Sequence, residues 1–303
     1  MLPFLDEAQV RAVLRMEDLI PAIERALIAF SAGRVVQPVR QMLSLEPQGG
    51  HFGAMPAAGA EVGMGVKLVT FYPSNAARGL PTHLAMILLF RPETGEPLAV
   101  MGGRLITEMR TAAASALATR AMAAVDAAVL AVLGTGVQAR VHVEALRLVR
   151  QFREVRVWGR TPERAARLAA DVGAVAMTLA QEAVRGADVV VTATSSMEPI
   201  LRGAWLGPGT HVNAVGWRGP QGRELDDEAM RGAFVVADSR EAVLREAGDV
   251  LLSGTEVHAE LGEILAGTKP IPPGMRTVFE SVGIAVEDVA AAWLVFGRHQ
   301  AAS

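Results

Sequence analysis

The sequence predicts an α/β protein built around a parallel sheet, preceded by a less regular part, and three observations predict this class. The chain has 303 residues, of which 51% are hydrophobic, so it can bury a large core and is long enough for two domains. From residue 127 onward, continuous apolar runs alternate with helix-like stretches, which is typical of parallel strands covered on both faces. The first of these runs ends in a glycine-rich turn that opens a helix.

The part of the chain before residue 126 mixes helical and strand-like patterns. Apolar residues recur at helical spacing near the start, and Pro21 is placed where a first-turn proline is tolerated. Glycine pairs then interrupt short strand-like segments, and a later segment is rich in alanine, the strongest helix former. The expected elements are helices at 1–32 and 111–125, short strands between 35 and 73, and a strand at 84–90 followed by the hairpin turn 91–97.

The part after residue 126 has the regular alternation of a parallel sheet. A proline-rich segment at 270–273 is interpreted as a linker, and the chain is expected to end in a helix at 284–298. The expected strands are 127–133, 155–158, 174–177, 188–194, 211–216 and 234–238, with helices after residue 136 and at 162–171.

Composition excludes several classes of function. A net charge of −3 and a pI near 6.1 give no electrostatic reason to expect nucleic acid as a partner. No segment approaches the apolar run of about 20 residues that a membrane span needs. The absence of cysteine rules out disulfides and thiolate ligands, and the six histidines include no His-x-x-x-His pair, so we expect no metal centre. An acidic pair near the start, where a signal peptide would be basic, makes the cytoplasm the expected compartment.

The glycine-rich turn has the sequence context of a dinucleotide site. Gly134, Gly136 and Ala139 follow an apolar strand and open a helix, as the fingerprint requires. The first glycine permits the tight turn, the second lets the backbone approach the pyrophosphate, and the helix start at Val137 and Gln138 faces the phosphates. An ordinary strand–helix turn is the alternative, and the context favours cofactor binding. We therefore expect a Rossmann domain.

The end of the second strand of this domain indicates which nucleotide is preferred. Enzymes that use NAD usually carry Asp or Glu there, to accept a hydrogen bond from the ribose 2′-hydroxyl. This chain has Arg160 and Thr161 instead, with Arg164 one turn later. Two guanidinium groups and a hydroxyl suit a 2′-phosphate, so the sequence predicts NADPH, with NADH as the alternative. Thr161 as a simple helix cap, with solvated arginines, is the competing interpretation.

Three cations lie in or beside apolar segments of the first part: Arg40, Lys67 and Arg110. Lysine is rare in this chain, so a lysine within the apolar segment 64–72 is informative. A buried charge needs a partner. That partner is either a substrate carboxylate or a structural acid such as Glu61 or Glu108, and spacing alone leaves both interpretations open.

Motifs through nearly the whole chain resemble those of the ornithine cyclodeaminase/mu-crystallin family. The residues in these motifs are most similar to those of the mu-crystallin branch. They occur in the family's order. The motifs are Val-Val-Gln-Pro-Val-Arg40, Lys67-Leu-Val-Thr-Phe-Tyr72, Ile106-Thr-Glu-Met-Arg110-Thr-Ala-Ala, Gly134-Thr-Gly-Val-Gln-Ala139, Asn213-Ala-Val-Gly216, Arg223-Glu-Leu-Asp-Asp-Glu228, Asp238-Ser-Arg-Glu-Ala242, Gly248-Asp-Val-Leu-Leu-Ser-Gly254 and Val278-Phe-Glu-Ser-Val-Gly283 with Val286-Glu-Asp288.

The resemblance implies a Rossmann domain at 113–283, inserted into an α+β substrate-binding and dimerisation domain formed by 1–112 and about 284–303. It implies a homodimer without a nucleic-acid or membrane partner. Arg40, Lys67 and Arg110 match the family's substrate-binding cations, and Lys67 matches the catalytic one. The remaining positions match cofactor contacts: Thr111, Gly134, Gly136, Val137, Gln138, Arg160, Thr161, Arg164, Thr194 and Val215.

The resemblance also implies a reaction, which is the NADPH-dependent reduction of a cyclic imine (ketimine) carboxylate. Two departures weigh against cyclodeamination. Gly53 stands where ornithine cyclodeaminases carry glutamate, and Trp217-Arg218 follows Gly216 where they carry an acid. The alternatives are cyclodeamination or amino-acid dehydrogenation by the same family, and a non-catalytic protein that binds NADPH and a carboxylate ligand.

Overall fold

The computed structural model describes residues 2–216 and 219–302, and the chain forms two compact units. The first unit consists of Met1–Arg110 together with Gly283–Ser303, and the second consists of Thr111–Val282. The second unit is therefore inserted into the first along the chain. The predicted α/β class, with one domain inserted into another, is confirmed.

The first unit contains a six-stranded sheet in the order β1-β6-β5-β4-β3-β2, in which β1 is parallel to β6 and the other neighbours are antiparallel. Its strands are β1 (Phe4–Leu5), β2 (Gln41–Leu45), β3 (Gly50–Gly59), β4 (Gly63–Phe71), β5 (His83–Phe90) and β6 (Pro97–Gly102). The expected strands between 35 and 73 and the expected hairpin at 91–97 are thus present.

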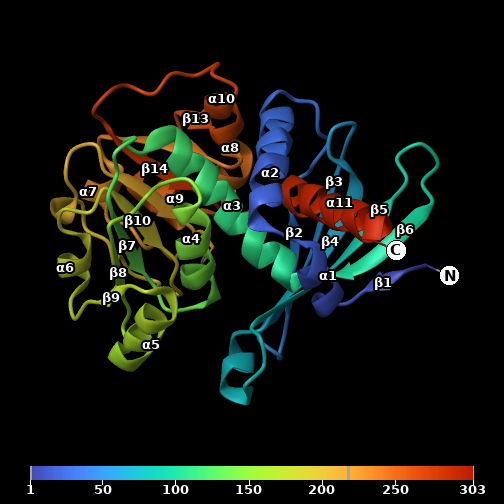
Figure 1. Ribbon diagram of the computed structural model, residues 1–303, viewed down its shortest axis with the longest axis horizontal. Coiled ribbons are helices and arrows are strands. Elements are labelled where there is room, and N and C mark those ends of the chain that lie inside the picture. The colour runs from blue at the N-terminus through green and yellow to red at the C-terminus, as the bar shows by residue number, and fades with distance from the viewer. Residues whose placement is uncertain (1, 217–218, 303) are drawn as a thin grey trace. The chain divides into compact units, whose positions relative to one another are not determined.

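Helices cover one face of this sheet. The C-terminal helix α11 (Ala285–Ala302) packs on β3, β4 and β5, and α2 (Met16–Ser31) packs beside it, as Figure 1 shows. Alternate residues of the central strands are buried under these helices, including Met55, Lys67 and Ile87, which lie side by side on three neighbouring strands. The register therefore brings a lysine into the apolar layer between sheet and helix.

The prediction of one helix over residues 1–32 is wrong in detail. The chain forms β1, then α1 (Glu7–Val13), and then α2. A reciprocal capping box between Asp6 and Gln9 starts α1, and the extended backbone at Leu14 and Arg15 separates it from α2. Pro21 lies inside α2 rather than in its first turn, so the helix tolerates the loss of one backbone donor there.

The second unit contains eight parallel strands in the order β13-β12-β14-β11-β10-β7-β8-β9. The chain runs outward from β7 to β9 and then returns to place β10 on the other side of β7. This reversal is the topological switch point at which dinucleotides bind in such sheets. The strands are β7 (Val129–Leu133), β8 (Glu154–Trp158), β9 (Val175–Ala176), β10 (Val189–Thr192), β11 (His211–Ala214), β12 (Ala233–Ala237), β13 (Ala259–Glu260) and β14 (Arg276–Glu280).

Helices accompany these strands along the chain (Figure 1). The alanine-rich helix α3 begins earlier than expected and runs from the first unit into the second. Residues 270–273 form no helix or strand, as expected of a linker, but the strand that follows them was not predicted: β14 lies centrally between β11 and β12. The helices are α3 (Arg104–Met122), α4 (Val137–Arg147), α5 (Pro162–Val172), α6 (Ala180–Val184), α7 (Asp227–Met230), α8 (Arg240–Glu246), α9 (Gly248–Ser253) and α10 (Leu261–Leu265), with short 3-10 turns η1 (Pro73–Arg78) and η2 (Gly203–Trp205).

Two further findings concern the described part of the chain only. None of its helices has the length and hydropathy that a membrane span requires. None of its clusters of histidine and carboxylate side chains has the arrangement of a metal site.

Candidate active site

Lys67 is the centre of a buried cluster of charges in the first unit. It lies on β4, only 2% exposed, and its Nζ is 2.5 Å from Oδ2 of Asp288 on α11. Arg110, on α3, donates from Nε to Oδ1 of the same aspartate at 3.0 Å and from Nη1 to Oε2 of Glu287 at 2.8 Å. One aspartate thus bridges two of the three cations that the sequence singled out.

Glu287 and Asp288 belong to the site, although they were not among its predicted residues. Both are fully buried in the first turn of α11, where the positive end of the helix dipole stabilises carboxylates. The side chain of Gln37 accepts a hydrogen bond at 2.6 Å from the backbone N–H of Val286 in that same turn. The motif that ends at Arg40 therefore also anchors the helix that carries the two acids.

A glycine at the start of this helix makes room for Arg110. Gly283 has φ +77°, and a Cβ there would lie 2.5 Å from Nη1 of Arg110. Any side chain would be strained by the backbone and would displace the guanidinium. We infer that this glycine is required by the close approach of the arginine.

Burial makes Lys67 a better proton donor than an ordinary lysine. Its pKa is lowered from 10.5 to about 8, chiefly because the apolar layer desolvates the ammonium group. Asp288 acts in the opposite direction, and the charges of Arg110 and Arg40 lower the pKa further. An ammonium with a pKa near 8 is still charged at neutral pH and can give up its proton readily.

The structural acids considered from the sequence are engaged elsewhere. Glu61 pairs with Arg34, with 2.6 Å between its Oε1 and Nε, and Glu108 pairs with Arg104, with 3.6 Å between Oε1 and Nη1. The ion pairs of Lys67 and Arg110 are therefore with Glu287 and Asp288. Arg40 precedes β2, is half-buried, and its charge acts on Lys67.

The glycine turn of the second unit has the form that a diphosphate needs. Gly134 has φ +142°, and a Cβ there would lie 2.5 Å from the carbonyl oxygen of Ala193. Gly136 caps α4, and a Cβ on it would meet no atom within 4 Å. The helix start at Val137 and Gln138 is thus open to a ligand, and a phosphate fits its unpaired N–H groups.

The residues after β8 leave their polar groups available. Arg160, Thr161 and Arg164 are all exposed, and Thr161 makes no side-chain cap for α5. Thr161 does occupy the N-cap position of α5, but its hydroxyl makes no capping hydrogen bond and so stays available to a ligand. Within residues 2–216 and 219–302, neither arginine forms an ion pair, so both can bind an added phosphate.

The remaining predicted cofactor contacts are divided between two places in the second unit. Thr194 and Val215 follow the adjacent strands β10 and β11, and the backbone N–H of Val215 donates to Thr192 at 3.0 Å. Thr111 is buried on α3. Glu224, which was not predicted, accepts hydrogen bonds from Thr194 and from Gly216.

Of the two departures from the cyclodeaminase pattern, the structure describes the one at Gly53. Gly53 lies on the sheet face that also carries Lys67, and a Cβ there would be 2.4 Å from the sulfur of Met42. A glutamate at this position would need Met42 to move. Trp217 and Arg218 lie outside the described residues.

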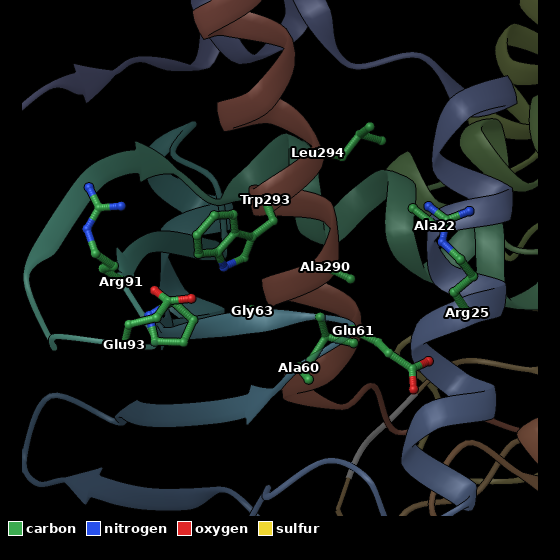
Figure 2. Close-up of a pocket in the computed structure, with 12 residues that line it drawn as sticks. Ala22, Arg25, Ala60, Glu61, Gly63, Arg91, Glu93, Ala290, Trp293 and Leu294 are labelled. Carbon is green, nitrogen blue, oxygen red and sulfur yellow. The ribbon is translucent and has the colours of Figure 1, made fainter.

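A surface pocket of about 520 Å³ also occurs in the first unit, between α2, α11 and two strand connections. Figure 2 shows the Trp293 ring extending from α11 toward Gly63 and Glu93, with Arg25 on the α2 side. None of Arg40, Lys67 and Arg110 lines it. We therefore assign the chemistry to the buried cluster and not to this pocket.

The fold and the two sites define a class of protein: a dinucleotide-binding α/β protein with a buried cationic site in its first unit and a glycine turn for the dinucleotide in its second. Residues 3–303 match the model of the ornithine cyclodeaminase/mu-crystallin family, and the chain belongs to this family. It is 49% identical over 300 residues to ketimine reductase mu-crystallin of Mus musculus, covering 97% of this chain and 96% of that protein.

Two solved structures are similar over almost the whole chain. One is Thermococcus litoralis Δ1-pyrroline-2-carboxylate reductase in complex with NADH and L-proline, with a TM-score of 0.94, 36% identity, and coverage of 100% of this chain and 98% of that one. The other is an archaeal alanine dehydrogenase, described as a dimer with bound NAD, with a TM-score of 0.93, 34% identity, and coverage of 99% and 97%.

Proposed function

We propose that the protein is an NADPH-dependent oxidoreductase that reduces the C=N bond of a cyclic imine carboxylate, such as piperideine-2-carboxylate or pyrroline-2-carboxylate, to the cyclic amino acid. The observation that carries this proposal is the buried lysine between an aspartate and two arginines. The named ketimine and pyrroline-2-carboxylate reductases among its relatives support the same reaction.

The charge of the cluster suits one carboxylate. Arg40, Lys67 and Arg110 are cations, and Glu287 and Asp288 are anions. Counted over these five side chains, one positive charge is in excess. A monoanionic substrate would balance it, with the arginine groups binding the carboxylate oxygens. Arg40 and Arg110 are thus the proposed carboxylate ligands.

Lys67 is the proposed proton donor. When bound, reduced nicotinamide supplies the hydride that forms the new C–H bond at the imine carbon. The electron pair of the C=N bond then stays on nitrogen, which needs a proton. The ammonium of Lys67 can donate it or polarise the imine, and Asp288 holds that ammonium in place. A site that only bound a carboxylate would not need a lysine with a lowered pKa.

The glycine turn and the exposed residues after β8 are the proposed cofactor site. Gly134, Gly136, Val137 and Gln138 would hold the diphosphate. Thr111, Thr194 and Val215 are the further contacts that family membership supports. Arg160, Thr161 and Arg164 offer two cations and a hydroxyl at the place where NAD enzymes usually carry an acid.

Replacing Arg160 by aspartate tests the preference for NADPH. The new carboxylate would repel a 2′-phosphate and accept from a 2′-hydroxyl, so the ratio of NADPH to NADH affinity should fall by about 10- to 100-fold. Affinities would be measured from the fluorescence of the reduced cofactors. Arg167→Asp, an equal charge change at an exposed position within α5, is the control. An unchanged ratio in Arg160→Asp would refute the assignment of the 2′-phosphate site.

Amino-acid dehydrogenation is the second candidate, because the similar archaeal structure is an alanine dehydrogenase. It is the same hydride transfer in the opposite direction and would use the same cations. Cyclodeamination is less well supported, since Gly53 packs against Met42 where that branch carries an acid. A net change in NADPH on turnover separates the redox reactions from a cyclodeaminase, which regenerates its cofactor.

We also propose a homodimer that buries the open face of the first unit's sheet. On this face Leu84 and Met86 of β5 are 47% and 44% exposed, and Leu43 of β2 is 58% exposed. Contiguous apolar residues on an uncovered sheet mark an interaction surface. Light scattering should give twice the 32.0 kDa of one chain, and Met86→Glu should halve it, whereas Leu179→Glu in the second unit should not.

The cytoplasmic location stays a prediction from the sequence. The function itself is tested by following the absorbance of the reduced cofactor with a panel of cyclic 2-carboxy imines, with NADPH and NADH side by side. Rapid oxidation of NADPH with at least one imine is the expected result. Tight NADPH binding without turnover across the panel would refute imine reduction.

A further inference from the structure

Glu224 is a buried carboxylate that joins the ends of two strands in the second unit. It is fully buried, and its Oε1 accepts from the backbone N–H of Thr194 at 2.7 Å and from the Thr194 hydroxyl at 2.5 Å. Its Oε2 accepts from the backbone N–H of Gly216 at 3.0 Å. One side chain therefore fixes two separate segments through three hydrogen bonds.

The segments that Glu224 joins lie at the edge of the sheet where a dinucleotide binds. Thr194 and Gly216 each come two residues after their strands, and β10 and β11 are parallel neighbours. The segment after β10 also touches the glycine turn, because the carbonyl oxygen of Ala193 would lie 2.5 Å from a Cβ on Gly134. In doubly wound sheets, the two halves of the dinucleotide lie on either side of the switch point. The residues after β8 are proposed to bind the adenosine half of the dinucleotide. The ends of β10 and β11 lie on the other side of the switch point, where the nicotinamide half would bind.

The surroundings of Glu224 are built around its carboxylate. A Cβ on Gly216 would lie 2.3 Å from Oε2 of Glu224, so only glycine permits this approach. Asp249 holds the backbone of the segment that carries Glu224, since its Oδ1 accepts from the N–H groups of Glu224 at 3.0 Å and Leu225 at 2.6 Å. The position of the carboxylate is therefore fixed from both sides.

Stability does not explain why this residue is an acid. Burial raises the pKa of Glu224 from 4.5 to about 7, with the charge of Asp249 acting in the same direction. An acid whose pKa is raised on folding destabilises the folded state as pH rises through that interval. A neutral side chain of the same size would avoid this cost. Only a carboxylate can accept hydrogen bonds on both of its oxygens from the donors of both segments.

We propose that Glu224 is a positioning residue for the nicotinamide half of the cofactor: its carboxylate holds the segments after β10 and β11 in the arrangement that receives the nicotinamide and its ribose. The proposal rests on the proposed function only in its use of a nicotinamide dinucleotide. Glu224 acts through its hydrogen bonds to Thr194 and Gly216, and not through Arg160 or Thr161, which are the residues proposed to bind the adenosine half.

The test is Glu224→Gln, studied with two ligands. The new amide NH₂ would face a backbone or hydroxyl donor, so one of the two segments is released. NADPH affinity should fall about tenfold or more. Affinity for 2′,5′-ADP, which carries only the adenosine half, should stay within about twofold.

Glu280→Gln is the matched control. Glu280 lies at the end of β14, is 5% exposed, and its Oε2 has no hydrogen-bond partner in the described chain. Burial raises its pKa well above the usual value, so this variant also removes a costly buried acid. It should bind both ligands as wild type does, since Glu280 does not join the two segments.

Each outcome decides the proposal. Loss of NADPH affinity with retention of 2′,5′-ADP affinity in Glu224→Gln alone supports it. Unchanged NADPH affinity, or an equal loss for both ligands, overturns it. If Glu224→Gln fails to fold, Glu224→Asp replaces it, because aspartate keeps the charge but is too short to reach both segments. This variant should also lose affinity for NADPH while it keeps its affinity for 2′,5′-ADP. Wild-type protein that binds NADPH but reduces no imine would overturn the proposed function and leave this test intact.

Discussion

Replacing Lys67 by methionine should lower the rate of imine reduction by about 10²- to 10⁴-fold, the usual contribution of a positioned general acid. Methionine has a similar length and suits the apolar layer, but it can neither donate a proton nor polarise the imine. NADPH affinity should remain close to that of the wild type, because Lys67 belongs to the first unit and the glycine turn to the second. Single-turnover kinetics with bound NADPH would measure the loss.

Two observations would separate a chemical role of Lys67 from a structural one. Lys269→Met changes the chain's other lysine, which is exposed, and should leave turnover unchanged. In the wild type, kcat/KM should fall as pH rises through about 8, because that is where the free enzyme loses the Lys67 proton. Retention of most activity in Lys67→Met would remove this residue from the mechanism.

Replacing Asp288 by asparagine should destabilise the first unit by about 3–5 kcal/mol, which is the usual cost of removing one partner of a buried ion pair. The variant removes the counter-charge that Lys67 and Arg110 share and leaves Arg110 paired with Glu287. Since Asp288 raises the pKa of Lys67, its loss should lower that pKa from about 8 to a smaller value. The free energy of unfolding would be measured by urea denaturation.

The pH dependence of this variant follows from the sign of the shift. A lysine whose pKa is lowered on folding reduces the free energy of unfolding by the full amount at pH values below its folded-state pKa. This reduction becomes smaller as the pH rises toward 10.5, the ordinary pKa of lysine. The loss of stability should therefore be larger at about pH 7 than at about pH 9. Asp18→Asn removes a partly exposed pair with Arg298, at 2.7 Å, and should cost less than about 1 kcal/mol. Equal losses in the two variants would contradict the buried-cluster interpretation.

The sequence predicted most of the second unit because its signals are local. The apolar run that ends at Leu133, the glycine turn and the helix that follows are adjacent in the chain, and their order alone indicates the fold. The strand β14 was missed because Arg276 and Glu280 at its ends make it less apolar than its neighbours, and its place between β11 and β12 depends on long-range pairing.

The partners of the cations could not be predicted for the same reason. Asp288 lies 178 residues after Arg110 in the sequence, and no local pattern connects them. Two acids in the first turn of a helix are typical of an exposed helix start, so Glu287 and Asp288 carried no sign of burial. The role of Glu224 likewise depends on the approach of Gly216, which only the fold creates.

Transfer of deuterium tests the central claim most directly. NADPH that carries deuterium at the reactive position of its dihydronicotinamide would be incubated with piperideine-2-carboxylate and with pyrroline-2-carboxylate, and the amino acid formed would be analysed by mass spectrometry. We predict one deuterium on the carbon that bears the carboxylate in at least one product. An amino-acid product without deuterium, or bound NADPH with no product from either imine, would contradict the proposed reaction.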